Sequence, residues 1–185
     1  MVITAALLAI GIVLPFLTGQ MQTFGKLISP LHIPVLICGL CCGWQWGLGL
    51  GIVLPIMRGL IFSMPPFPAV ALPMAFELGA YGLLTGLLYP LFIRLFKKKN
   101  HLPAIYTSLI LAMIGGRLIG GAAKALLITT GLIGSKNPYT FKVFLTSYFV
   151  ETGIGALIHL VIVPAVILAV EKARLSPILI TKEIK

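Results

Sequence analysis

The chain has 185 residues, of which 59% are hydrophobic, and its mean hydropathy is +1.10. Soluble domains contain about 45–50% apolar residues, so this composition excludes a soluble globular protein and indicates a membrane protein. The net charge of +10 comes from 14 Lys and Arg against 4 Asp and Glu. These charges stand at the ends of apolar stretches, which favours membrane topology and anionic lipid over nucleic acid as their explanation.

The first apolar stretch covers residues 2–17, and we interpret it as a retained transmembrane helix. It lacks the basic start of a signal peptide, and the residues Gly19-Gln20-Met21 do not resemble a cleavage site. A polar loop with Gly and Pro follows over residues 18–30.

Residues 31–58 are nearly all apolar, and this length fits either one long helix or two short ones. Within them, Trp44 and Trp46 stand between Gly43 and Gly47. Tryptophan favours the headgroup level and glycine permits a sharp bend. The pattern therefore favours two helices joined by an interfacial turn, and a single long helix remains the alternative.

Three further spans are predicted after a loop at residues 63–68, where Pro65, Pro66 and Pro68 remove backbone donors. The three spans cover residues 70–95, 103–132 and 140–170. A span needs about 20 apolar residues. The sequence thus predicts an all-α integral membrane bundle of six transmembrane helices, as a single domain over residues 1–185.

Basic clusters predict the orientation. Residues 97–99 and the tail over residues 172–185 follow the fourth and sixth predicted spans, so both lie on one side. The positive-inside rule makes that side cytoplasmic. With six helices the N-terminus is cytoplasmic too, whereas five helices would place it outside and satisfy the rule equally well.

Several chemistries lack their motifs in this sequence. No Walker-type loop is present, so a partner must perform any ATP-driven work. Cys38, Cys41 and Cys42 supply only half of a zinc site, so we expect no metal and no cofactor. Glu151 and His159 are eight residues apart, about 80° around a helix, and no serine stands in a nucleophile-elbow motif. We therefore expect no enzyme.

Ionisable residues inside the predicted spans indicate where a ligand binds. Each costs about 2.5–3.5 kcal/mol on insertion scales, so such residues usually face a cavity or a partner. Arg58, Glu77, Lys124 and Glu151 all fall in the outer part of their spans. Together they predict a polar pocket that opens outward. The alternative is structural pairing, for example of Glu77 or Glu151 with Arg117.

The first predicted helix carries small residues at Ala5 and Ala9. This spacing places both on one helical face, where another helix can approach closely. The pattern suggests docking of a partner on this face.

At this point the chain resembles the substrate-binding S component of an energy-coupling factor (ECF) vitamin transporter. The resemblance covers nearly the whole chain and rests on residues 29–39, 55–62, 64–66 and 74–82. Two runs within these ranges, His32-Ile33-Pro34 and Met74-Ala75-Phe76-Glu77-Leu78, are typical of one branch of the family. Within that branch the chain is most similar to the pantothenate type.

This resemblance implies a multi-pass protein of the bacterial cell membrane that captures a vitamin on the outer side. Loops equivalent to residues 18–30, 63–68 and 133–139 would cover the ligand. Docking on a transmembrane scaffold subunit would use Ala5 and Ala9, and two cytosolic ATPases would supply energy while the S component topples in the membrane. The predicted substrate-binding residues are Arg58, Glu77, Tyr81, Arg117, Asn137 and Glu151.

The carboxylate, two hydroxyls and amide of pantothenate suit Arg58 together with polar neighbours, because Arg grips a carboxylate in a bidentate way. Glu77 argues against an anion, since an acidic wall suits hydroxyls or an amine. Two other classes remain open, a self-contained secondary transporter and a structural membrane subunit. The sequence shows no fixed-period repeat of the kind that transporters often contain.

Overall fold

The computed structural model describes residues 1–17, 29–96, 101–134 and 139–173. All regular secondary structure in these ranges is helical, which confirms the predicted all-α class. The elements are α1 (Val2–Leu17), α3 (His32–Cys42), α4 (Trp44–Phe62), α5 (Ala71–Phe96), α6 (Leu102–Thr129), α7 (Phe141–Leu145), the π-helical η1 (Thr146–Val150) and α8 (Gly153–Lys172).

Four helical stretches of the described chain are long and apolar enough to cross a membrane. They are Trp44–Phe62, Ala71–Phe96, Leu102–Thr129 and Phe141–Val170. The other two predicted spans are shorter apolar helices, α1 with 16 residues and α3 with 11. The helices are consistent with a membrane bundle, and that all six cross the membrane stays a prediction.

The shortness of α3 has a structural consequence. An 11-residue helix rises about 16 Å, roughly half of the hydrocarbon thickness of about 30 Å. Its side chains Val35, Leu36 and Leu40 are fully buried, and it contacts α1, α4, α5 and α8. A short central helix leaves interior space at the level of its N-terminus, next to Ser29 and His32.

The predicted break between two helices in residues 31–58 is confirmed. Gly43 separates α3 from α4 with φ 95° and ψ 173°, a conformation that L-residues with a side chain rarely adopt. Trp44 and Trp46 both lie exposed beside this turn, as expected for residues at the headgroup level. Helix α4 then continues beyond residue 58 to Phe62.

Close contact between α4 and α5 depends on glycine. A Cβ atom at Gly47 would lie 2.6 Å from the carbonyl oxygen of Gly82, closer than real side chains approach. The two backbones can therefore meet directly, and this pair of helices forms one of the two most extensive interfaces in the described bundle.

The last predicted span is not one continuous helix. Within residues 140–170, the π-helical η1 and a turn at residues 151–152 separate α7 from α8. The amide of Glu151 donates to the carbonyl of Thr146 at 2.9 Å, the i to i+5 bond of a π-turn. The preceding span also ends earlier than predicted, at Thr129, before Gly131 with φ 73°.

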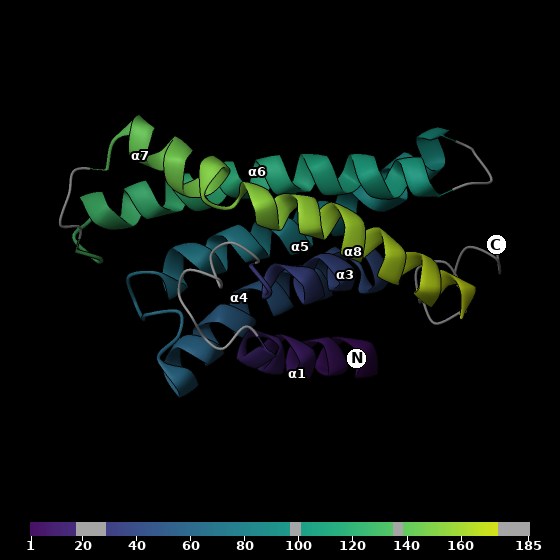
Figure 1. The fold of residues 1–185 in the computed structure, drawn as a ribbon, viewed down its shortest axis with the longest axis horizontal. Coiled ribbons are helices and arrows are strands. Elements are labelled where there is room, and N and C mark those ends of the chain that lie inside the picture. The colour runs from purple at the N-terminus through teal and green to yellow at the C-terminus, as the bar shows by residue number, and fades with distance from the viewer. Residues whose placement is uncertain (18–28, 97–100, 135–138, 174–185) are drawn as a thin grey trace.

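The helix ends gather at two ends of the bundle (Figure 1). One end holds the start of α1, the junction of α3 with α4, the end of α5, the start of α6 and the end of α8. The other holds the end of α1, the start of α3, the junction between α4 and α5, the end of α6, and α7. The helix ends that flank the three predicted outward loops are therefore together.

Candidate functional site

A cavity of about 410 Å³ lies at the second of these ends. This volume is within the range of about 300–1,000 Å³ that is usual for small-molecule sites. Its walls come from the end of α1, the start of α3, the end of α4, the loop after it, the start of α5, α6, η1 and the turn after η1. The cavity is thus above the short helix α3, in the space that this helix leaves open.

Arg58 lines the cavity and is 1% exposed. Its guanidinium lies beside two rings that contact each other, 5.3 Å from the centroid of Phe16 and 5.2 Å from that of Phe62. One of its terminal nitrogens donates to the carbonyl of Ile12. Arg58 therefore joins α4 to α1 and holds a positive charge at a fixed place in the wall.

No acidic side chain of the described chain forms an ion pair with Arg58, and its Nε atom is buried without a hydrogen-bond partner there. A buried charge without a counter-ion is costly. The cavity wall therefore contains a positive charge that a bound anion would neutralise.

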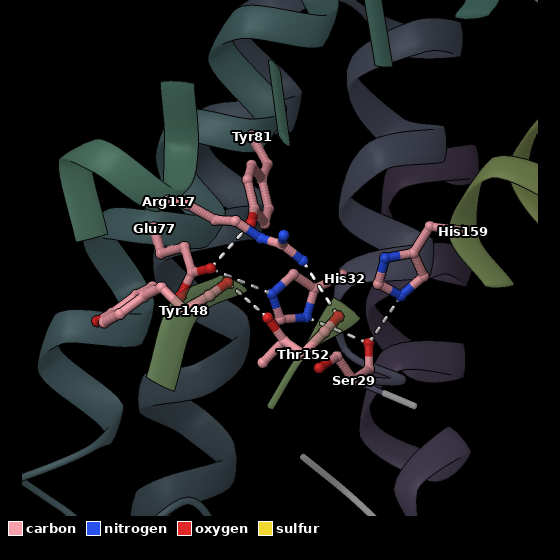
Figure 2. A network of polar contacts seen from close by, with 8 residues as sticks. All are labelled: Ser29, His32, Glu77, Tyr81, Arg117, Tyr148, Thr152 and His159. Atoms are coloured by element: carbon pink, nitrogen blue, oxygen red, sulfur yellow. Dashed lines mark hydrogen bonds and ion pairs between the residues drawn. The ribbon is translucent and has the colours of Figure 1, made fainter. Parts of the chain in front are cut away.

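Glu77 lines the cavity from α5, and its partners belong to a buried polar network (Figure 2). Its Oε1 atom accepts the hydroxyl of Tyr81 at 2.8 Å and lies 3.7 Å from Nε2 of His32. Tyr81 is fully buried and does not line the cavity. Its role in this structure is to hold the carboxylate of Glu77.

The carbonyl oxygen of Ser29 joins two buried imidazoles. Nδ1 of His32 lies 3.1 Å from it and Nε2 of His159 lies 3.2 Å from it, with the two rings stacked at 5.4 Å. A carbonyl only accepts, so both of these nitrogens are protonated donors. Figure 2 shows His32 between Glu77 and Ser29, with His159 on the other side of Ser29.

Arg117 is predicted from the sequence to bind substrate, but it does not line the cavity. Its Nη2 atom donates to the carbonyl of Thr152 at 3.2 Å, and its guanidinium lies 5.6 Å from the ring centroid of Phe149. The alternative pairing of Arg117 with Glu77 is not the one seen, since Glu77 is next to His32 and Tyr81. The side chain satisfies backbone at the end of η1.

Two further charges, Lys124 from α6 and Glu151 after η1, line the cavity as the sequence predicts. Nζ of Lys124 also lies 5.4 Å from the ring centroid of Tyr139. Asn137, also predicted to bind substrate, lies outside the described residues.

Sequence reasoning missed His32, Tyr148 and Thr152, which line the cavity. His32 stands at the start of a helix, where polar side chains are common without any role in ligand binding. Tyr148 and Thr152 face inward because the π-turn shifts the helical register, and a helical pattern alone does not reveal such a turn.

Two other predictions concern residues outside the cavity. Ala5 and Ala9 are both exposed on α1, so no other part of the described chain covers their face of the helix. Cys38 and Cys41 are buried in α3, and the described residues contain no group of three or more metal-ligating side chains.

These features define a multi-pass α-helical membrane protein with an internal polar cavity at one end. The family model described as "ECF transporter, substrate-specific component" matches residues 1–167, and the chain belongs to this family. Neither the curated proteins nor the solved structures gave a match. Members of the family bind a small-molecule substrate and work with an ECF module of a scaffold and ATPases. The chain is therefore a transporter subunit and not an enzyme.

Proposed function

We propose that this S component captures a small carboxylate vitamin in the cavity, with pantothenate as the best candidate and Arg58 as its anion anchor. The observation that supports this most is the buried guanidinium of Arg58, which faces the cavity without an acidic partner in the described chain. Its two flanking rings hold it in place, so little side-chain freedom is lost when an anion binds.

The contacts of Glu77 are compatible with an anionic ligand. Nδ1 of His32 donates to the carbonyl of Ser29, and its Nε2 faces Oε1 of Glu77 at 3.7 Å. The same oxygen accepts the hydroxyl of Tyr81, so two side chains of the polar network engage this carboxylate. This lessens the objection that Glu77 raises against an anion.

Lys124 and Glu151 contribute opposite charges to the same cavity. The cavity thus contains charges of both signs, and the guanidinium of Arg58 has the shape that suits a carboxylate. Glu77, Tyr148 and Thr152 supply polar groups for the hydroxyls and amide of pantothenate, while Glu151 is a further polar contact. Tyr81 supports Glu77 from behind.

We further propose that the cavity faces outward, with both termini cytoplasmic in a bacterial cell membrane. The start of α1 and the end of α8 share one end of the bundle (Figure 1), opposite the cavity. The basic residues Arg94 and Lys172 close α5 and α8 at that end, which supports this orientation. Docking on the ECF scaffold subunit then uses the face of Ala5 and Ala9.

Titration calorimetry with two ligands tests the proposal. Panthenol is pantothenate with an alcohol in place of the carboxylate. Arg58→Gln should weaken pantothenate binding by about 2–5 kcal/mol, the usual cost of removing one partner of a desolvated pair, and should change panthenol binding little. Arg58→Lys should retain only part of the affinity for pantothenate, because an ammonium group cannot bind a carboxylate in the bidentate way of a guanidinium.

Arg94→Gln is the matched control, because Arg94 is exposed in the last turn of α5 at the opposite end. It should bind both ligands like the parent protein. Equal losses for the two ligands in Arg58→Gln would mean that Arg58 supports the fold rather than the carboxylate. Unchanged pantothenate binding would remove Arg58 from the site.

A further inference from the structure

The part of the cavity wall formed by residues 146–152, here called the wall segment, departs from regular α-helix. It contains η1 and the turn that follows it, and it supplies Ser147, Tyr148, Glu151 and Thr152 to the cavity. Irregular π-turns of this kind occur often at functional sites. The shape of this side of the cavity therefore depends on what keeps the wall segment in place.

Apolar packing alone holds the wall segment weakly. Neither α7 nor η1 has a buried residue, whereas Val163 and Ile167 in α8 are fully buried. Contact with α6 occurs through rings against glycine. A Cβ at Gly120 would lie 3.3 Å from the ring of Tyr148, and Gly121 lies directly under the ring of Phe144.

Arg117 supplies a polar attachment to the same segment from α6. Its Nη2 atom donates to the carbonyl of Thr152, which also accepts the helical bond from Ala156. The hydroxyl of Thr152 donates at 2.7 Å to the carbonyl of Tyr148. One buried cation is thus connected, through Thr152, to two residues of the cavity wall (Figure 2).

We propose that Arg117 is a positioning residue, which fixes the wall segment and so sets the shape of the cavity without touching the ligand. A charge-assisted bond to a carbonyl is stronger than a neutral one, and the ring of Phe149 stabilises the same guanidinium. The expected effect of Arg117 on ligand affinity rests on the proposed function. Its expected effect on the stability of the wall segment does not.

Hydrogen exchange of the full chain in detergent, without ligand, tests the first effect. In Arg117→Gln the amides of residues 146–152 should exchange about tenfold faster or more, because a hydrogen bond from a charged donor is lost. Amides of α8 beyond residue 157 should be unchanged. Arg117→Lys should recover part of the protection against exchange. Phe149→Leu, which keeps Arg117, should increase the exchange rate of the same amides by a smaller factor than Arg117→Gln does.

Calorimetry on the same variants tests the second effect. If Arg117 is a positioning residue, Arg117→Gln should weaken the binding of pantothenate and of panthenol by the same factor. Arg58→Gln, in contrast, should weaken mainly the binding of pantothenate. A loss confined to pantothenate would overturn the proposal in favour of a direct anion contact, as would unchanged exchange in the wall segment. If the parent protein binds neither ligand, the proposed function fails, and the exchange result still decides the role of Arg117.

Discussion

At the scale of single residues, the contact between His32 and Glu77 affects the electrostatics of the cavity wall. Nε2 of His32 lies 3.7 Å from Oε1 of Glu77. Asn at position 32 would keep a donor near the place of Nδ1, and hence the bond to Ser29, but would remove the group that faces Glu77. The carboxylate would keep the hydroxyl of Tyr81 but lose the imidazole.

His32→Asn should therefore weaken pantothenate binding by about 2 kcal/mol, the order of the repulsion between two like charges in one cavity at an effective dielectric of about 20. Panthenol binding should fall much less. Adding Glu77→Gln to His32→Asn should restore most of the lost affinity, because no carboxylate remains. Calorimetry on the two single variants and the double variant measures this. Additive losses in the double variant would show that the two residues act independently.

The sequence allows prediction of which charges face the cavity better than of how each is satisfied. Arg58, Glu77 and Glu151 are charged residues within apolar stretches of the sequence, and all three line the cavity. The bond from Arg117 to Thr152 joins residues 35 positions apart through a backbone carbonyl. Every residue has such a carbonyl, so no side-chain pattern marks this one as the partner.

At the scale of helices, two interruptions were not equally predictable. The break at Gly43 has local signals, since glycine permits its positive φ and two tryptophans mark an interface. The break after η1 is more weakly marked, because residues 146–152 contain neither proline nor glycine and the first glycine is Gly153, where α8 begins. Its cause is tertiary: the packing of Phe144 and Tyr148 on the glycines of α6 and the bond from Arg117.

Helix α1 provides a prediction at this scale. Ala5 and Ala9 are exposed and do not line the cavity, whereas α1 contacts Arg58 further along, through Ile12 and Phe16. Ala9→Trp should block close approach of a partner helix and so abolish vitamin uptake by cells, while binding to the isolated protein stays within about twofold, since surface changes cost about 0.5 kcal/mol or less.

Leu111→Trp is the matched control, because Leu111 is an exposed residue in the middle of α6. It should leave both uptake and binding intact. Normal uptake by Ala9→Trp with its ATPase partners present would show that the scaffold docks elsewhere.

At the scale of the whole molecule, the short helix α3 and the cavity above it explain how a chain of this size can bind a ligand inside the membrane. Six helices of full length would fill the interior with side chains. Because α3 has 11 residues, polar groups from α4, α5 and α6 meet in the space beside its N-terminus. Members of the chain's family work with an ECF module of a scaffold and ATPases.

The central claim is that this S component binds one carboxylate vitamin in that cavity. Native mass spectrometry of the detergent-purified chain, equilibrated with an equimolar mixture of vitamins, tests it most directly. We predict a single adduct with the mass of pantothenate at one ligand per chain, which is lost in Arg58→Gln and retained in Arg94→Gln. An adduct with a neutral or cationic vitamin, or no adduct at all, would contradict the claim.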